Sequence, residues 1–301
     1  MKSLITLWKF SRPHTIIGSI ISICALYSIV CDRDKTQHFP LLIMALAIGI
    51  TCNIFIVGIN QMADVNIDKI NKPYLPIPSG ALSMHEAKII AYTSLFISLG
   101  MALFISPYLF GIIALSAAIG WAYSMPPFFL KQHHIPATLS ITIVRGVMIN
   151  VGGFMVFNYI VNKTLEIPEN VKILTLFIVV FSIAISWFKD LPDVEGDAKY
   201  NIKTFAILYS PKAALITGNL LVGTAYLFTI YIKYTDFVTS EISSVKTTVL
   251  LYGHIFLFAL FIVNTFSISL GKLHSIKKFY KRFWMFFFAE YMLYLVAYLY
   301  G

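Results

Sequence analysis

The feature that most constrains the fold of this chain is a series of apolar segments, each long enough to cross a lipid bilayer. A helix rises about 1.5 Å per residue, so roughly 20 apolar residues span the hydrocarbon core. We predict such spans at residues 14–31, 40–61, 86–106, 108–125, 137–158, 170–188, 209–232, 247–270 and 283–300. Backbone polar groups in lipid have to be satisfied internally, which favours helices. We therefore expect an all-α, polytopic membrane protein with nine transmembrane helices around a central cavity, residues 1–301 forming one domain.

The composition agrees with this class and explains the excess of positive charge. The 301 residues are 58% hydrophobic and only 12% charged, against about 25% charged residues in soluble proteins. A net charge of +9 can indicate binding of nucleic acid, but in a membrane protein it reflects lysine and arginine in cytoplasmic loops. We therefore expect contact with membrane lipid and none with nucleic acid.

The basic residues are distributed unevenly between the two sides of the predicted membrane. Most lysines and arginines in the connections fall on the side of the N-terminus. The positive-inside rule assigns that side to the cytoplasm. We therefore expect a multi-pass protein whose N-terminus and active-site loops, described next, are cytoplasmic.

A first acidic cluster follows the second span, in NQMADVNIDKINKPYLPIPSG (60–80). If the helix continues, Asn60, Asp64 and Asp68 recur every four residues and drift only about 40° per step around the axis. They would form one stripe of oxygen ligands. The prolines that follow cannot continue the helix, so they predict a stiff connector over the mouth of the cavity.

A second acidic cluster, KDLPDVEGD (189–197), follows the sixth span on the same side. The spacing of Asp190, Asp193 and Asp197 favours one helical face. Carboxylates held close together at a membrane boundary repel one another and lose hydration, so a counter-ion is expected. Oxygen ligands without Cys or His favour Mg²⁺, which suggests two ions with a diphosphate between them. The simpler alternative is that these acids are solvated loop charges.

Four further residues near the clusters extend the candidate site. Lys72 and Lys189 are placed to balance the acids or to contact a phosphate. Arg145 lies inside an apolar span, where an arginine either pairs with an acid or binds an anion. Tyr123 stands at the membrane edge, before a proline-rich turn that forms a further candidate lid segment.

The acidic segments close the second and the sixth span, four spans apart. This spacing suggests two four-helix halves plus a ninth helix. Repeated halves and intramembrane charges also occur in transporters, so an ion-coupled carrier is an alternative function. Its coupling acids are expected near the bilayer midplane, whereas these acids gather at one face.

The two acidic segments resemble the aspartate-rich motifs of the UbiA-type intramembrane prenyltransferase superfamily, as do WKFSRPHTIIGS (8–19) and YSMPPFFLK (123–131). Within it the chain is most similar to homogentisate prenyltransferases, through Asn60-Gln61, NKPYLP and KDLPDVEGD. The resemblance implies nine transmembrane helices around a cavity in which Mg²⁺ holds an isoprenoid diphosphate. It implies that Asn60 is a metal ligand. It implies that five aspartates are both metal ligands and catalytic residues: Asp64, Asp68, Asp190, Asp193 and Asp197. It implies contacts with the prenyl diphosphate from Asn60, Lys72, Tyr123, Arg145 and Lys189.

The activity implied by the resemblance is Mg²⁺-dependent transfer of a prenyl group from a prenyl diphosphate to an aromatic acceptor. For homogentisate, transfer is coupled to loss of the acetate carboxyl as CO₂, in prenylquinone or tocopherol synthesis. Two departures, IPSG at 77–80 and Phe129 where a basic residue is expected, concern the acceptor. A chlorophyllide-like tetrapyrrole and a glyceryl phosphate lipid are therefore alternative acceptors.

Overall fold

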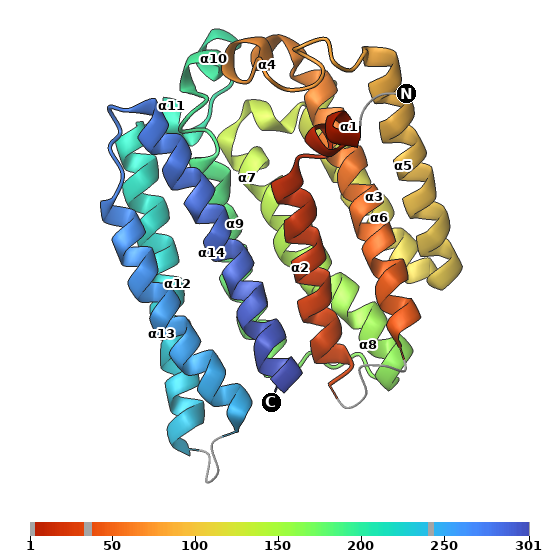
Figure 1. The fold of residues 1–301 in the computed structure, drawn as a ribbon, viewed down its shortest axis with the longest axis vertical. Helices are drawn as coiled ribbons and strands as arrows, with labels where there is room; N and C mark the ends of the chain where they lie inside the picture. Colours follow the sequence, from red (N-terminus) through yellow and green to blue (C-terminus); the bar gives the residue numbers. More distant parts are fainter. Residues whose placement is uncertain (1–3, 33–37, 240–243, 301) are drawn as a thin grey trace.

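The computed structural model describes residues 4–32, 38–239 and 244–300. Within these residues nine helices are long and apolar enough to cross a membrane. They run roughly along the long axis of the molecule (Figure 1). The prediction of an all-helical, multi-pass integral membrane protein is therefore confirmed.

The long helices agree with the predicted spans in number and order. They are α2 (Pro13–Val30), α3 (Phe39–Ala63), α5 (Met84–Ile105), α6 (Pro107–Ser124), the composite span His134–Asn162, α9 (Glu169–Phe188), α12 (Pro211–Thr239), α13 (Val245–Phe266) and α14 (Leu273–Tyr300). The short helices between them are α1 (Leu4–Phe10), α4 (Val65–Asn71), η1 (Leu130–Gln132), α10 (Val194–Lys199) and α11 (Phe205–Leu208).

Several helices extend beyond the predicted apolar runs. The ninth begins at Leu273 rather than at residue 283, because hydropathy marks only the apolar part of a helix whose first turns carry lysines. The fifth begins at His134 rather than at residue 137. Pro136 falls within its first turn, where backbone N–H groups have no intrahelical partner, so the proline is tolerated.

The composite fifth span contains a feature that the sequence did not predict. It consists of α7 (His134–Thr142), a π-helical segment η2 (Ile143–Gly153) and α8 (Phe154–Asn162). Asn150 lies in η2, where its Nδ2 donates to the Gly146 carbonyl (2.9 Å) and its Oδ1 accepts from the Tyr291 hydroxyl of α14 (2.8 Å). Such π-helical turns occur frequently at functional sites, and Arg145 lies in this one.

The helices pack around an aromatic core in the C-terminal half. Helix α9 contacts α12, and α14 contacts both α2 and α13. The rings of Phe181 in α9 and Phe283 in α14 stack with 4.3 Å between their centres, and both side chains are fully buried. This half forms one wall of the molecule, and α3, α5 and α6 form the opposite wall (Figure 1).

The two acidic connectors lie at the same end of the bundle. Helices α4 and α10 contact each other at the end where α1 lies (Figure 1). Residues 72–82 form turns rather than a helix, as the three prolines predicted. The fold therefore brings together two segments that are far apart in the sequence.

Candidate active site

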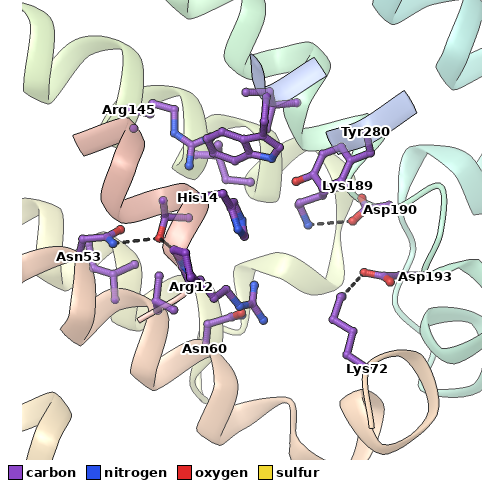
Figure 2. A pocket seen from close by; sticks show the side chains of 18 of the residues that line it. Arg12, His14, Asn53, Asn60, Lys72, Arg145, Lys189, Asp190, Asp193 and Tyr280 are labelled. Carbon is purple, nitrogen blue, oxygen red and sulfur yellow. Dashed lines mark hydrogen bonds and ion pairs between the residues drawn. The ribbon is translucent and has the colours of Figure 1, made fainter. Parts of the chain in front are cut away.

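A large cavity of about 920 Å³ opens beneath the two connectors. Helices α2, α3, α6 and α14, the π-helical segment and both connectors supply its walls (Figure 2). Every predicted site residue lines it: Asn60, Asp64, Asp68, Lys72, Tyr123, Arg145, Lys189, Asp190, Asp193 and Asp197. Its volume lies at the upper end of the range for sites that bind small molecules.

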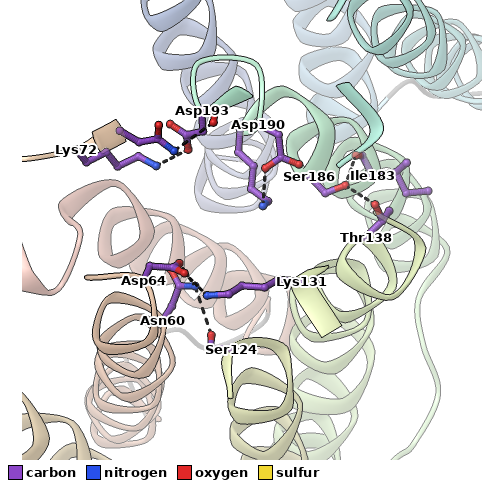
Figure 3. A network of polar contacts seen from close by, with 12 residues as sticks. Asn60, Asp64, Lys72, Ser124, Lys131, Thr138, Ile183, Ser186, Asp190 and Asp193 are labelled. Carbon is purple, nitrogen blue, oxygen red and sulfur yellow. Dashed lines mark hydrogen bonds and ion pairs between the residues drawn. The ribbon is translucent and has the colours of Figure 1, made fainter. Parts of the chain in front are cut away.

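The first acidic cluster keeps the predicted stripe although its helix is interrupted at Asp64. The backbone N–H of Asp64 bonds to the Asn60 carbonyl (3.0 Å), and that of Asp68 bonds to the Asp64 carbonyl (2.7 Å), so the four-residue pattern continues. The Asn60 side chain donates to Asp64 Oδ2 (3.0 Å), and Asp64 also pairs with the buried Lys131 (Figure 3). Asp68 Oδ2 lies 3.9 Å from Arg12 Nη2 but accepts no hydrogen bond.

The second cluster does not form the predicted helical face. Helix α9 ends at Phe188, turns follow, and α10 begins only at Val194. Pro192 lacks the N–H that a continuous helix needs at this point. The turns nevertheless direct Asp190, Asp193 and Asp197 to the same cavity, whereas Glu195 is exposed.

A lysine and an asparagine of the first connector hold the second. Lys72 pairs with Asp193 (Figures 2 and 3). Asn71 donates from Nδ2 to the Asp193 carbonyl and accepts from the Gly196 N–H, both at 3.2 Å. A Cβ atom on Gly196 would overlap the Asn71 amide, so the close approach of α4 and α10 requires glycine here.

The electrostatics of the site follow from burial and pairing. Burial raises the pKa of Asp68 to about 6, although Lys72 and Arg12 oppose the shift. Burial, with Asp190 adding to it, raises the pKa of Asp197 to about 7. Burial lowers the pKa of Lys131, against the opposing effect of Asp64. The site therefore holds carboxyl groups that exchange protons near neutral pH.

Two of the residues predicted to contact the diphosphate, Tyr123 and Arg145, lie in the cavity wall among aromatic side chains or beside a lysine. Tyr123 belongs to the cavity wall at the end of α6, with the Lys189 Nζ atom 5.8 Å from its ring centre, rather than to a lid over the cavity. The guanidinium of Arg145 stacks on Trp284 (4.6 Å) and Phe287 (5.5 Å). In the part of the chain that the structure describes, Arg145 has no acidic partner.

Several cavity residues were not among the predicted site residues: Arg12, His14, Asn53, Lys131 and Tyr280. The segments WKFSRPHTIIGS and YSMPPFFLK contain Arg12, His14 and Lys131, so the resemblance already carried a signal for these three. Asn53 and Tyr280 had none, because neither lies in one of the motifs identified in the sequence.

The acids of the two clusters supply the oxygen ligands that Mg²⁺ prefers. Among the described residues, no three His, Cys, Asp or Glu side chains lie close enough together to hold a metal by themselves. Mg²⁺ commonly uses only one or two carboxylates and completes its coordination with water and substrate phosphates. The site offers only oxygen ligands, and one of them, Asp68 Oδ2, accepts no hydrogen bond. These ligands fit an Mg²⁺ ion that is shared between a few carboxylates, water and phosphate, and not one enclosed by protein ligands alone.

Fold and site together define an all-helical membrane enzyme whose chamber is lined by carboxylates and lysines at one end. The chain belongs to the UbiA prenyltransferase family, whose sequence profile matches residues 21–289. The expected family is thus confirmed.

Relatives of known name extend over nearly the whole chain. Homogentisate phytyltransferase from Synechocystis sp. is 34% identical, over 99% of this chain and 96% of its own. Homogentisate phytyltransferase 1 from Arabidopsis thaliana is 31% identical, over 97% of this chain and 75% of its own. A solved UbiA homolog from Archaeoglobus fulgidus, described as bound to GPP and Mg²⁺, is 17% identical with a TM-score of 0.64, over 95% of this chain and 99% of its own. This likeness shows the shared fold.

Proposed function

We propose that this protein transfers a prenyl group from a prenyl diphosphate to homogentisate, with loss of CO₂, in prenylquinone or tocopherol synthesis. The observation that carries the proposal is the meeting of two carboxylate-bearing connectors over one chamber. The names of the relatives support the acceptor. The two connectors that carry the acids lie at one end of the bundle (Figure 1), which favours this reaction over ion-coupled transport.

The connectors are the proposed binding site of the donor diphosphate. Asn60, Asp64 and Asp68 would contribute ligands to one Mg²⁺ ion, and Asp190, Asp193 and Asp197 would contribute ligands to a second, with water and diphosphate oxygens completing the coordination of each ion. Bound Mg²⁺ stabilises the negative charge that develops on the departing diphosphate. The lysines paired with these acids are close enough to bind phosphate oxygens as well, and Lys131 joins the set although only Lys72 and Lys189 were predicted.

An apolar space for the tail of the donor adjoins the first cavity. A second cavity of about 150 Å³ shares Ser19, Asn53 and Ile56 with the first, and its lining is mostly apolar. Burial of a hydrocarbon chain there removes it from water. The donor would thus lie with its diphosphate at the connectors and its tail among the helices.

The chamber wall suits an electrophilic reaction. The bond between the donor's allylic carbon and the diphosphate oxygen breaks, the cation bonds to a ring carbon of the acceptor, and that carbon loses its proton. The acetate carboxyl then leaves as CO₂, and a proton takes its place. Trp284, Phe287 and Tyr280 line the cavity, and aromatic faces stabilise a nearby cation without trapping it.

We also propose that the connectors and the N-terminus face the cytoplasm, that the helices contact lipid, and that the chain is one domain. The positive-inside distribution supports this orientation. A cysteine introduced at the exposed Glu195 should be labelled by an impermeant reagent only in inside-out vesicles. Labelling from the outer face would reverse the assignment.

The experiment that tests the function supplies purified protein with Mg²⁺, a labelled prenyl diphosphate and one acceptor at a time. The acceptors are homogentisate, 4-hydroxybenzoate, a chlorophyllide and a glyceryl phosphate lipid. We expect label to appear in the homogentisate product alone. Transfer to the tetrapyrrole or to the lipid instead would retain the reaction type and overturn the acceptor.

A further inference from the structure

Arg145 is a charged side chain in the cavity wall for which the donor site gives no explanation. Its guanidinium lies on Trp284 and Phe287, and it donates no side-chain hydrogen bond within the described residues, although Nη1 is buried. Cation–π contact compensates only part of the lost hydration of a buried cation. The residue therefore needs an anion that the described part of the chain does not supply.

Among the residues that the structure describes, the surroundings of Arg145 contain no such anion. Helix α14 presents Tyr280, Trp284, Phe287 and Tyr291 to this part of the cavity. Helix α2 presents His14, whose ring lies 4.9 Å from that of Trp284. The acid of α14 in this region, Glu290, is bonded instead to His254 of α13 at 2.9 Å.

The donor's diphosphate is already provided with cations. Lys72, Lys131 and Lys189 each contact a carboxylate of the acidic clusters, and Arg12 lies close to Asp68. Within the described residues Arg145 pairs with none of these carboxylates, and it lies in the π-helical segment, about 15 Å along the span from His134. Figure 2 shows Arg145 and the Lys72–Asp193 pair on opposite sides of the cavity.

The geometry points to Arg145 as the binding group for the carboxylate of the aromatic acceptor. Stacking on Trp284 occupies the face of the guanidinium and leaves its edge, which matches a carboxylate in a bidentate pair. The neighbouring aromatic side chains offer apolar surface to the ring that bears that carboxylate. This inference rests on the proposed function, and it replaces the predicted contact of Arg145 with diphosphate.

Such an anchor determines how the acceptor lies. With its carboxylate at Arg145, the ring extends toward the connectors, where the reactive carbon of the donor lies when the diphosphate is bound there. The anchor therefore selects acidic acceptors over neutral ones of the same shape and orients the ring for attack. Arg145 should affect the use of the acceptor and leave binding of the donor unchanged.

The test compares an acceptor with and without its charge, in wild type, Arg145→Met and Arg145→Lys. The acceptors are homogentisate, its methyl ester and methylhydroquinone, each at saturating prenyl diphosphate. We expect Arg145→Met to lower kcat/KM for homogentisate by about 10- to 100-fold, the effect of one charge-assisted pair. We expect kcat/KM for the two neutral acceptors, and KM for the donor, to remain within about twofold. Arg145→Lys should restore part of the preference for the acid.

Lys72→Met is the matched control, because it removes a cation of the same cavity from the donor side. It should raise KM for the donor and leave the preference for the acid over its ester unchanged. Equal losses with acidic and neutral acceptors in Arg145→Met, or a raised KM for the donor, would overturn the inference. If Arg145→Met does not fold, the comparison of wild type with Arg145→Lys decides, and an unchanged acid preference refutes the anchor.

The outcome also separates this inference from the proposed function. A wild-type enzyme that uses homogentisate, with no change of preference in Arg145→Met, refutes the anchor alone. A wild-type enzyme that prefers another aromatic acid refutes homogentisate as the acceptor. The same comparison is then made with that acid and its ester. A wild-type enzyme that alkylates only uncharged acceptors refutes both.

Discussion

Gly196 lies at the contact between the two connectors, so a substitution at this position tests whether that contact assembles the site. In Gly196→Ala, the new Cβ would lie 2.5 Å from Asn71 Nδ2 and 2.6 Å from Asn71 Cγ, so the amide must move. Both hydrogen bonds of Asn71 to the second connector would be lost. At about 1 kcal/mol for each bond, the docking of α10 on α4 weakens by about 2 kcal/mol. That corresponds to roughly 30-fold in the ratio of docked to undocked connectors.

The assay is diphosphate release measured over a range of Mg²⁺ and donor concentrations. We expect kcat/KM for the donor to fall by about 10- to 30-fold, because both acidic clusters have to face one diphosphate. Gly223→Ala is the matched control, since no atom lies within 4 Å of its added Cβ in α12, and it should retain wild-type activity. Asn71→Ala should resemble Gly196→Ala, and the double variant should be no worse than either, because the two residues share one interaction. Wild-type activity in Gly196→Ala, or additive losses in the double variant, would refute this reasoning.

Two further predictions concern the acidic clusters. Asp64→Ala and Asp190→Ala should each reduce diphosphate release by about 1000-fold, as expected for removal of a metal ligand, while the protein remains folded in detergent; substantial release by both variants would refute the two-cluster site. Because Mg²⁺ binds the ionised carboxylate, protons compete with it as the pH falls through the raised pKa values of Asp197 and Asp68, about 7 and 6. Between pH 8 and pH 6 the apparent affinity for Mg²⁺ should therefore weaken by about tenfold in total through Asp197 and by about twofold through Asp68, and an affinity independent of pH over that range would contradict the assignment.

The fold was largely predictable because the bilayer imposes a simple rule on sequence. A segment that crosses hydrocarbon has to be apolar and helical, and within the described part of the chain nine such segments were found close to where hydropathy placed them. The helix ends were less predictable. The lysines in the first turns of α14 interrupt the apolar run but not the helix, so the helix begins earlier than residue 283.

The site was predictable in its chemistry and less so in its geometry. Asp64 and Asp68 keep their helical spacing although the helix is interrupted between α3 and α4. Asp190 and Asp193 instead lie in turns around Pro192, so they do not share a helical face. The pairing of Asp64 with Lys131 joins segments 67 residues apart, and no local pattern specifies it. The same holds for Arg145, whose aromatic partners come from the last helix of the chain.

The most direct measurement of the central claim is the mass of the product. Purified protein is incubated with Mg²⁺, homogentisate and geranylgeranyl or phytyl diphosphate, with a parallel sample in EDTA. We predict a prenylated methylquinol in which the prenyl group replaces one ring hydrogen and the acetate group has become a methyl group. Its mass equals that of homogentisic acid plus the prenyl group, less one hydrogen and one CO₂. We predict no product in EDTA. Product formed equally in EDTA, or neither alkylated acceptor nor released diphosphate in lipid-reconstituted protein, would contradict it.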